Sequence, residues 1–553
     1  MNNKNLAEML FPHINKTMSD YDAIYPERVL PEGAKVTRLG PSPTGFIHLG
    51  NLYGAFADER LATQSNGVFF LRIEDTDDKR QVEGAVEVII NSLKFFGINF
   101  GEGVTVDGSV GEYGPYYQSE RGPIYQCFAK ELVEKGLAYP CFLNEEEITS
   151  IREKQEKAKQ NPGIYGEWAK NRELTYDEIL VNIKAGKPYV IRLKSQGNPT
   201  ATGDEIKTIS VEDGIRGTMV MPENIQDIVI LKATGIPTYH FAHVVDDHLM
   251  RTTHVVRGAE WLSSLPVHVE LFNVLGLEMP VFCHTAQLMK LDENGNKRKL
   301  SKRLDPELSL EYYKSQGYHP KAVREYLLTI LNSNFEEWRI ANPDLPMEDF
   351  PFTIEKMSNS GALFDLNKLN DISKDVLVKI PAKELYAWLK AWASEFRPGT
   401  SNLFENNEEY FEKILNLGRS GDKPRKDLIY ASQIFEFISY FFDDYFKIED
   451  KNPENISDED IKLILNAYIE SYNHSDDQSA WFDKIRTFGL TLGYAAKPKE
   501  YKKNPELYKG HVGNVSTVIR IAVMGRSQSP DVWEIQQILG KEKTKARISK
   551  QLK

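Results

Sequence analysis

The spacing of apolar residues changes within the first hundred residues of the chain. Residues 35–39 form a short extended stretch, and apolar side chains then recur at the spacing of an amphipathic helix between Leu49 and Leu61. Between them lies PSPTG (41–45), in which two prolines fix φ and a glycine permits a close approach of the backbone. The pattern therefore predicts a strand, a rigid turn and a helix.

A second strand is predicted at VFFLRIEDTD (68–77), an apolar run that ends in acidic residues. Strand, turn, helix and strand form half of a doubly wound α/β domain, in which ligands bind beyond the carboxyl ends of the strands. Segments 40–45 and 74–77 both fall at such ends. His48 stands at the start of the predicted helix, where unpaired N–H groups and the helix dipole favour an anion.

Further along, the pattern predicts an inserted domain and then a return to the first sheet. The expected elements of the insertion are a helix and two strands, at 145–160, 188–194 and 218–222. The apolar strand 227–232 is expected to rejoin the first sheet, followed by a strand at 254–261. A helix with Pro266 near its start and Gly276 at its end comes next. Later strand signals are scarce, and amphipathic helices are predicted, among them 321–331, 428–442 and 515–525.

These patterns divide the chain into six predicted parts. They are an N-terminal extension (1–34), the first half of a Rossmann-type core (35–115), an inserted α+β domain (116–226), the second half of the core (227–289), a basic loop with an adjoining domain (290–335) and a helical region (336–553).

Composition narrows the class of protein. A chain of 553 residues is too long for one core, and 41% hydrophobic with 27% charged residues is typical of globular proteins. No stretch approaches the roughly 20 apolar residues that span a bilayer, and the N-terminus lacks the apolar core of a secretion signal. Three cysteines argue against a disulfide framework and fit a reducing cytoplasm. A net charge of -12 disfavours indiscriminate nucleic-acid binding but permits local basic patches.

The densest of the basic stretches is DENGNKRKLSKR (292–303). Five of the seven residues from Lys297 to Arg303 are cationic, and packing them together costs repulsion unless an anion binds among them. Lysines suit a polyphosphate, because a flexible ammonium follows charge that develops on a leaving group. A solvated basic loop is the alternative interpretation.

Two segments together carry a resemblance. HLGN (48–51) and KLSKR (299–303) resemble the paired signatures of class I aminoacyl-tRNA synthetases. With RIEDTD, PTYHFAHVVDDHLM and EWL, the chain is similar to glutamyl-tRNA synthetases, whereas the related glutaminyl enzymes typically carry a PEPNG-type sequence at 41–45. The resemblance implies an α/β fold with a class I Rossmann-type nucleotide-binding core, an inserted α+β domain that contacts the acceptor end, a stem-contact domain and an all-α C-terminal anticodon-binding region.

The resemblance also implies an activity. Glutamate would attack the α-phosphate of ATP to give glutamyl-adenylate, and the terminal ribose of tRNA(Glu) would then take the glutamyl group. Mg²⁺ is expected to arrive on the ATP phosphates. No zinc is expected, because CFLN at Cys141 is followed by no cysteine or histidine between 143 and 200. Charging of tRNA(Gln) is left open, and relatives are commonly monomers.

Site residues follow from the resemblance position by position. The residues expected to be catalytic are His48, Lys299 and Lys302. The remaining expected ATP contacts are Gly50, Glu260, Trp261, Leu288 and Met289. The expected glutamate contacts are Arg38, Gly40, Ser42, Glu74, Tyr239, His243 and Arg257. His243 departs from relatives that carry an asparagine there: a neutral imidazole replaces one amide hydrogen bond, and a protonated one would attract a carboxylate.

Two other functions remain open at this point. One is a truncated relative that glutamylates a modified base in tRNA, although such proteins generally lack a long helical region. The other is a non-catalytic paralogue that binds nucleotide or tRNA, which would not need to keep both phosphate sites.

Overall fold

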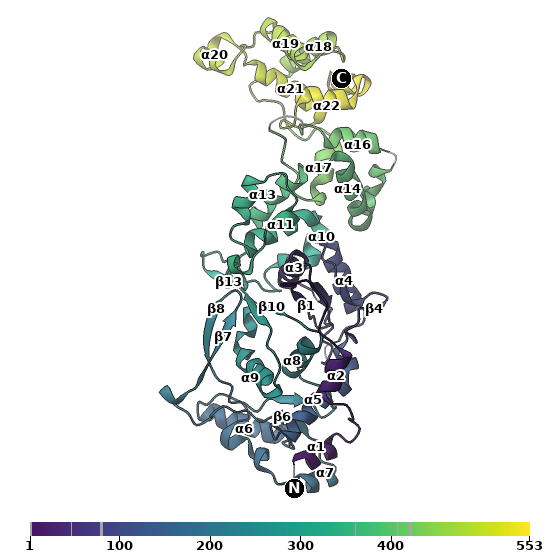
Figure 1. The fold of residues 1–553 in the computed structure, drawn as a ribbon. Helices are drawn as coiled ribbons and strands as arrows, with labels where there is room; N and C mark the ends of the chain where they lie inside the picture. The colour runs from purple at the N-terminus through teal and green to yellow at the C-terminus, as the bar shows by residue number, and fades with distance from the viewer. Residues whose placement is uncertain are drawn as a thin grey trace. The chain divides into compact units, whose positions relative to one another are not determined.

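The computed structural model forms two compact units (Figure 1). The first comprises Met1–Tyr312 with Val323–Asp365, and the second comprises Tyr313–Ala322 with Leu366–Lys553. The residues that the structure describes are 3–45, 47–77, 81–359, 361–405, 407–419 and 423–552.

The first sheet confirms the predicted strand, turn, helix and strand. Its order is β1 (Val36–Leu39), β2 (Val68–Leu71), β3 (Glu102–Thr105) and β4 (Gly108–Val110). The first three strands are parallel, and β4 pairs antiparallel with β3. Helix α3 (Leu49–Gln64) connects β1 to β2, and α4 (Ala85–Phe95) connects β2 to β3. The carboxyl ends of β1 and β2 therefore lie at one edge, where ligands are expected.

A second sheet continues the core. Its order is β10 (His254–Gly258), β11 (Val281–Thr285), β7 (Thr208–Asp213) and β8 (Gly217–Pro222). Thr253 donates its N–H to the carbonyl of Val36 in β1 at 3.0 Å, so β10 lies beside β1. The predicted strand 254–261 ends earlier, because a 3₁₀ turn, Ala259–Ser264, begins after Gly258. Helix α9 (Leu265–Leu275) ends at Gly276, which has a left-handed conformation as expected.

The prediction that 227–232 rejoins the first sheet is wrong. Strand β9 (Val229–Leu231) pairs antiparallel with β6 (Val190–Leu193), which in turn pairs with β5 (Ala138–Cys141) in a separate three-stranded sheet. The predicted strand 218–222, expected within the insertion, instead belongs to β8, and its hairpin with β7 joins the core through β11. Apolar runs identify buried strands, but they do not identify the partner strand.

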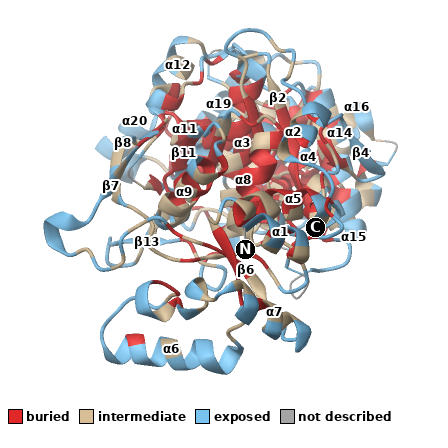
Figure 2. Cartoon of the chain, turned by 60° about the horizontal axis from the view of Figure 1, so that its bottom comes forward, coloured by how far each residue is buried: buried red, intermediate tan, exposed pale blue. Residues whose placement is uncertain are grey.

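Helices cover these sheets unevenly. Helix α8 (Tyr239–Leu249) is mostly buried, whereas α6 (Glu145–Lys157), predicted at 145–160, is mostly exposed (Figure 2). The other helices of this unit are α1 (Asn3–Leu10), α2 (Met18–Ile24), α5 (Gly122–Glu134), α7 (Tyr176–Lys184) and α12 (Phe335–Ala341).

The N-terminal extension is anchored by Arg28, whose terminal nitrogens bind Glu102 at 2.7 and 2.8 Å.

A fourth, small sheet carries the basic loop. Strands β12 (Leu288–Leu291) and β13 (Lys297–Lys299) form an antiparallel hairpin, and β14 (Ala362–Leu363) pairs parallel with β12. The chain then passes between the units through α10 (Leu310–Gln316) and α11 (Pro320–Leu331).

The second unit is helical, as predicted. Its helices are α13 (Leu366–Leu377), α14 (Ala382–Phe396), α15 (Pro398–Ser401), α16 (Glu408–Leu415), α17 (Ile434–Ile438), α18 (Asp458–Ser471), α19 (Gln478–Thr491), α20 (Pro498–Lys503), α21 (Val512–Met524), α22 (Val532–Leu539) and α23 (Lys541–Leu552). The single helix predicted at 428–442 is wrong, since 3₁₀ turns flank the short α17. Among the described residues, no helix is long and apolar enough to cross a membrane.

Candidate active site

A cavity of about 490 Å³ opens in the first unit at the carboxyl ends of β1 and β10 and the first turn of α3. The site residues expected from the sequence that line it are Arg38, Gly40, Ser42, His48, Gly50, Glu74, Tyr239, Arg257, Glu260, Trp261, Leu288 and Lys299. Lys302, Met289 and His243 are not among its described lining residues. Segments that are distant in the chain thus converge on one cavity.

His48 caps the N-terminus of α3. Its Nδ1 accepts the N–H of Asn51 at 3.3 Å, and Asn51 Oδ1 accepts the N–H of His48 at 3.0 Å. Burial, together with the nearby charge of Lys302, lowers the pKa of His48. The neutral ring therefore carries its proton on Nε2, which makes it a hydrogen-bond donor at the positive end of a helix.

The chain just beyond the KLSKR segment meets the first signature segment at the backbone. His48 forms an isolated antiparallel bridge with Ser309, a few residues beyond the KLSKR segment. Lys299 and Leu300 line the same cavity as His48 and Gly50. A polyphosphate in this cavity would therefore have the helix N-terminus on one side and lysines on the other.

An acidic residue that the sequence analysis missed holds the basic loop. Asp305 binds both terminal nitrogens of Arg298 at 2.6 and 2.7 Å, and it accepts the N–H of Ser301 at 2.8 Å. The Arg298 guanidinium lowers the pKa of Asp305 to about 2. One of the five loop cations is therefore paired within the protein. The sequence signal for this contact was an acidic residue, Asp305, shortly after the basic run.

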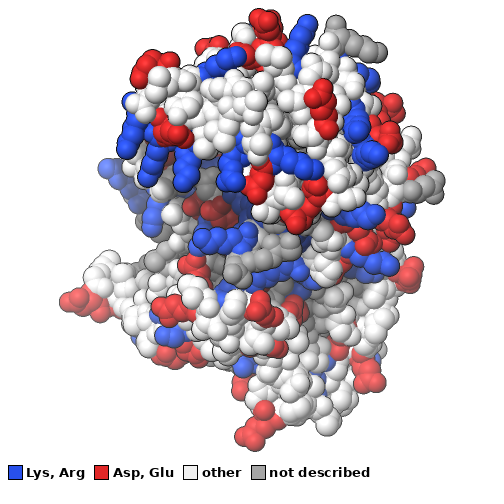
Figure 3. Space-filling view, turned by 90° about the horizontal axis from the view of Figure 1, so that it is seen from above, with Lys and Arg blue, Asp and Glu red and all other residues white. Residues whose placement is uncertain are grey.

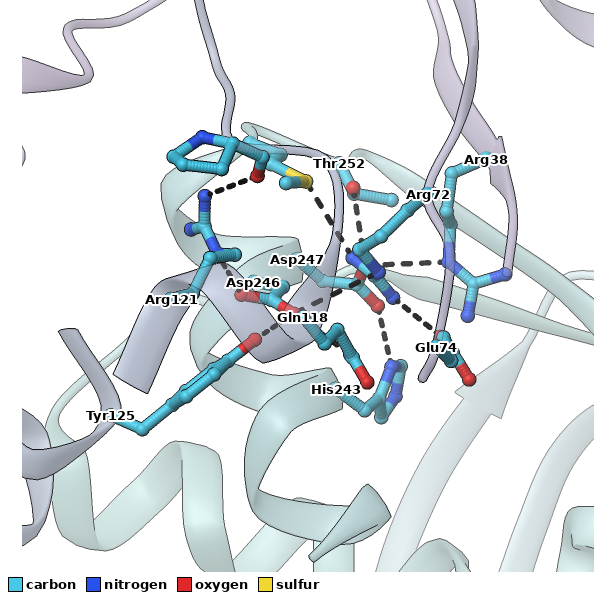
Figure 4. A network of polar contacts seen from close by, with 12 residues as sticks. Arg38, Arg72, Glu74, Gln118, Arg121, Tyr125, His243, Asp246, Asp247 and Thr252 are labelled. Carbon is cyan, nitrogen blue, oxygen red and sulfur yellow. Dashed lines mark hydrogen bonds and ion pairs between the residues drawn. The ribbon is translucent and has the colours of Figure 1, made fainter. Parts of the chain in front are cut away.

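Buried charges below the cavity fix two residues of its wall (Figure 4). Asp247 Oδ1 lies 2.7 Å from Arg72 Nη1 and 3.3 Å from Arg38 Nε, and Arg72 Nη2 lies 3.0 Å from Glu74 Oε1. Burial alone would raise the pKa of Asp247, but the two arginines hold it well below its ordinary value. Arg38 and Glu74 are thereby held in place before any ligand binds.

Gly40 and Glu74 fit together closely. A Cβ built on Gly40 would lie 2.3 Å from Glu74 Oε1, so only glycine fits beside that carboxylate in this arrangement. On the opposite wall, the 3₁₀ turn after β10 carries Glu260 and Trp261, and the Trp261 ring lies 4.3 Å from that of Tyr239.

Comparison with known families agrees with this geometry. Residues 35–371 match the catalytic domain of the class I tRNA synthetases (E and Q), and residues 384–552 match an anticodon-binding domain. The chain is 63% identical over 553 residues to the glutamate–tRNA ligase of Acetivibrio thermocellus, with 100% of both chains covered. It is 48% identical to that of Clostridium perfringens strain 13, covering 99% of this chain and 100% of the relative.

This chain belongs to the glutamate–tRNA ligase family. The predicted class I synthetase fold, with its helical anticodon-binding region, is confirmed. Among solved structures it resembles a glutamate–tRNA synthetase from Elizabethkingia anophelis, with a TM-score of 0.74, 27% identity and coverage of 94% of this chain and 99% of that one. A glutamate–tRNA ligase from Elizabethkingia meningosepticum, solved in complex with its amino acid, gives a TM-score of 0.73 at 26% identity, with the same coverage.

His243, the residue at which this family member departs from some relatives, lies behind the cavity wall. Its ring stacks on Tyr239 with centroids 5.8 Å apart, and its Nδ1 lies 2.6 Å from Asp247 Oδ2. Burial lowers the pKa of His243 to about 3, so the ring is neutral near pH 7. Of the two alternatives that the sequence left open, the protonated imidazole is therefore disfavoured.

The cavity wall also includes residues that were not predicted from the sequence, among them Asp58. Gly50, Gly54 and Asp58 follow each other at intervals of four along α3, and all three line the cavity. Asp58 is fully buried and neither of its carboxyl oxygens has a hydrogen-bond partner among the described residues. Burial raises the pKa of Asp58 well above its ordinary value. The spacing of four residues from Gly50 to Gly54 and from Gly54 to Asp58 was the sequence signal that Asp58 lies on the same face of the helix.

Proposed function

We propose that this chain activates L-glutamate with ATP to form glutamyl-adenylate and transfers the glutamyl group to the 3′ end of tRNA(Glu), releasing diphosphate and AMP. The observation that carries this proposal is the convergence of His48, Lys299, Arg38 and Arg257 on one cavity. A site with this set of groups offers donors to a polyphosphate and two buried guanidinium groups to a dicarboxylic amino acid.

The ATP half of the site consists of His48, Gly50 and the basic loop. In this proposal Nε2 of His48 donates to the phosphates, and Gly50 leaves room for the adenosine. A Cβ on Gly50 would lie 3.0 Å from the His48 ring, so a side chain there would crowd that ring. Lys299 and Lys302 stabilise the charge that develops on the departing diphosphate. Mg²⁺ enters with ATP, held mainly by phosphate oxygens.

The glutamate half consists of two arginines and a carboxylate. Arg38 and Arg257, both buried, donate to the carboxylates of the substrate. Glu74 receives the α-ammonium group beside the backbone of Gly40. Burial raises the pKa of Glu74, and an incoming ammonium would favour its charged form. Ser42 and Tyr239 add hydrogen bonds.

The chemistry needs no nucleophile from the protein. A carboxylate oxygen of glutamate attacks the α-phosphorus, and the bond to the β-phosphate bridging oxygen breaks as diphosphate leaves. A terminal ribose hydroxyl of tRNA then attacks the acyl carbon, and AMP leaves with the electron pair of the broken bond. The protein positions the reactants and stabilises charge on the phosphates.

The tRNA partner is supported by the match of 384–552 to an anticodon-binding domain. On the face shown in Figure 3, basic and acidic side chains are both present, so the net charge of -12 does not form a uniform acidic surface there. Basic groups on such a surface can contact phosphates. A monomeric state and a cytoplasmic location stay predictions, and whether tRNA(Gln) is also charged stays open.

Aminoacylation of purified tRNA(Glu) and tRNA(Gln) with labelled glutamate tests the proposal. We expect glutamate to be attached to tRNA(Glu) in an ATP-dependent reaction. We also expect ATP–diphosphate exchange with glutamate only when tRNA is present. Failure to charge tRNA(Glu) at any glutamate concentration would refute the proposal, and complete absence of exchange would favour a non-catalytic binding protein. The truncated base-modifying relative is disfavoured by the anticodon-binding domain.

A further inference from the structure

Arg257 is held by two buried imidazoles. Its Nε donates to His284 Nε2 at 2.9 Å, and its Nη1 lies 3.0 Å from His268 Nδ1. Its guanidinium also lies over the ring of Phe282, 4.6 Å from the centroid. The remaining nitrogen, Nη2, has no hydrogen-bond partner among the described residues. Arg257 lines the cavity, and the two imidazoles fix the plane of its guanidinium there.

The guanidinium dictates the protonation of both rings. An arginine side chain has donors and no acceptor, so the imidazole nitrogens facing it must both accept. His284 must therefore carry its proton on Nδ1, and His268 must carry its proton on Nε2. Burial lowers the pKa of both histidines, which keeps each ring neutral and leaves one nitrogen as an acceptor.

Asp213 enforces that tautomer in His284. Its Oδ2 lies 2.6 Å from His284 Nδ1, so the carboxylate receives the proton that Arg257 excludes from Nε2. Its Oδ1 accepts the N–H groups of Ile215 and Arg216, each at 3.0 Å, which fixes the carboxylate at the end of β7. Burial alone would raise the pKa of Asp213, but the His284 and backbone hydrogen bonds hold it below its ordinary value.

We propose that Asp213 and His284 are positioning residues for glutamate binding: the Asp213 carboxylate fixes the tautomer of His284, and His284 holds the Arg257 guanidinium in the orientation in which it lines the cavity. This inference rests on the proposed function of Arg257. It assigns a role in the site to β7, a strand that lies next to β11 and supplies no residue to the cavity wall.

Asp213→Asn separates this role from simple packing. The amide oxygen can keep the backbone hydrogen bonds from Ile215, Arg216 and His284, while the amide nitrogen takes the place of Oδ2 and faces His284 Nδ1. His284 must then accept at Nδ1 and carry its proton on Nε2, where it meets the N–H of Arg257. Two donors face each other, so Arg257 loses its orientation although the shape of the site is almost unchanged.

Two substitutions of His284 supply a matched pair. In His284→Gln the amide lies near the position of Nε2 and can still accept a hydrogen bond from Arg257. In His284→Asn the amide lies near the position of Nδ1, where it can donate to Asp213 but cannot reach Arg257. If the contact with Arg257 matters, the glutamine variant retains more function than the asparagine variant. If only packing matters, the loss of activity in the two variants follows the size of the new side chain, and KM for glutamate is not affected selectively.

The experiment measures steady-state aminoacylation of tRNA(Glu) by the full chain, with KM for glutamate and KM for ATP determined separately. We expect Asp213→Asn and His284→Asn to raise KM for glutamate about tenfold or more, as for a lost hydrogen bond to a charged group, with KM for ATP changed less than about twofold. His284→Gln should lie between them and the unmodified chain.

Asp227→Asn is the control. Asp227 is an equally buried carboxylate that accepts from Ser195 N at 2.9 Å and Tyr139 OH at 2.8 Å, and it is not among the described lining residues. Unchanged KM for glutamate in folded Asp213→Asn, or equal rises in both KM values, overturns the inference. So does an Asp227→Asn variant with the same selective effect. Failure of the unmodified chain to charge tRNA would instead refute the proposed function.

Discussion

The guanidinium of Arg298 binds the carboxylate of Asp305 with both terminal nitrogens, at 2.6 and 2.7 Å. The same carboxylate accepts the N–H of Ser301, so it ties the residue before the KLSKR segment and the central serine of that segment to one point. The sequence of this loop left two interpretations of its five cations open, an incoming anion as their partner or solvation. In the folded chain a carboxylate of the protein pairs one of them, and this organises the loop before ATP binds.

Asp305→Asn should therefore impair ATP use and spare glutamate binding. Loss of the charge removes the ion pair to Arg298 and weakens the bond to Ser301, which loosens Lys299 and Lys302. We expect kcat to fall about tenfold, with KM for glutamate nearly unchanged. Aminoacylation kinetics with each substrate varied in turn measure this.

Asp292→Asn is the matched control for that variant. Asp292 lies in the turn of the same hairpin and accepts the N–H of Asn296 at 2.8 Å, and like Asp305 it is not among the described residues of the cavity wall. Equal losses in the two variants would show that general hairpin stability, not the Arg298 ion pair, controls the rate.

The same ion pair should contribute to stability in a pH-dependent manner. The pKa of Asp305 lies below its ordinary value of 3.8, at about 2, so the folded state favours the charged carboxylate. Its contribution is present in full above the unfolded value and is lost as the pH falls from about 4 towards 2. Denaturant unfolding of the unmodified chain and Asp305→Asn should show a difference in free energy that is constant from pH 7 to 5 and shrinks below pH 4. A difference that grows on acidification would contradict the assignment.

Lys302→Ala should lower the rate of adenylate formation far more than ATP affinity. A lysine that contacts the departing diphosphate acts in the transition state, and loss of such a donor typically costs about 2–4 kcal/mol. The rate of ATP–diphosphate exchange in the presence of tRNA, with ATP binding measured separately, tests this. Equal losses in rate and affinity would count against a transition-state role.

Arg257→Lys should strongly weaken the binding of glutamate. A lysine offers one point charge where the planar guanidinium donates to His284 and His268 and also lines the cavity. We expect a rise in KM for glutamate of at least about tenfold. Near-normal KM and kcat in this variant would refute the assignment of Arg257 as a carboxylate ligand.

Gly40→Ala should also weaken glutamate binding selectively. The added Cβ would lie 2.3 Å from Glu74 Oε1 and displace the carboxylate that is proposed to bind the α-ammonium group. We expect KM for glutamate to rise about tenfold, the effect of a lost charge-assisted hydrogen bond. Gly122→Ala, where a Cβ would meet no atom within 4 Å, is the control and should behave like the unmodified chain.

Local sequence determined much of the first unit. The 41–45 turn, the start of α3 at Leu49 and the end of α9 at Gly276 follow from proline and glycine stereochemistry and from helical spacing. These features depend on residues that are near each other in the chain, and they can therefore be predicted from the sequence.

Tertiary structure decided which of these elements meet. Strand β9 was expected in the first sheet and pairs instead with β6, because strand pairing depends on the total burial of distant segments and not on the apolar run itself. Arg257, His284 and Asp213 come from three strands, and no periodicity relates them. Their hydrogen bonds exist only because β10, β11 and β7 lie side by side. In these buried surroundings of low dielectric constant, a polar group without a hydrogen-bond partner costs free energy, so the tautomer of His284 decides whether Arg257 has an acceptor.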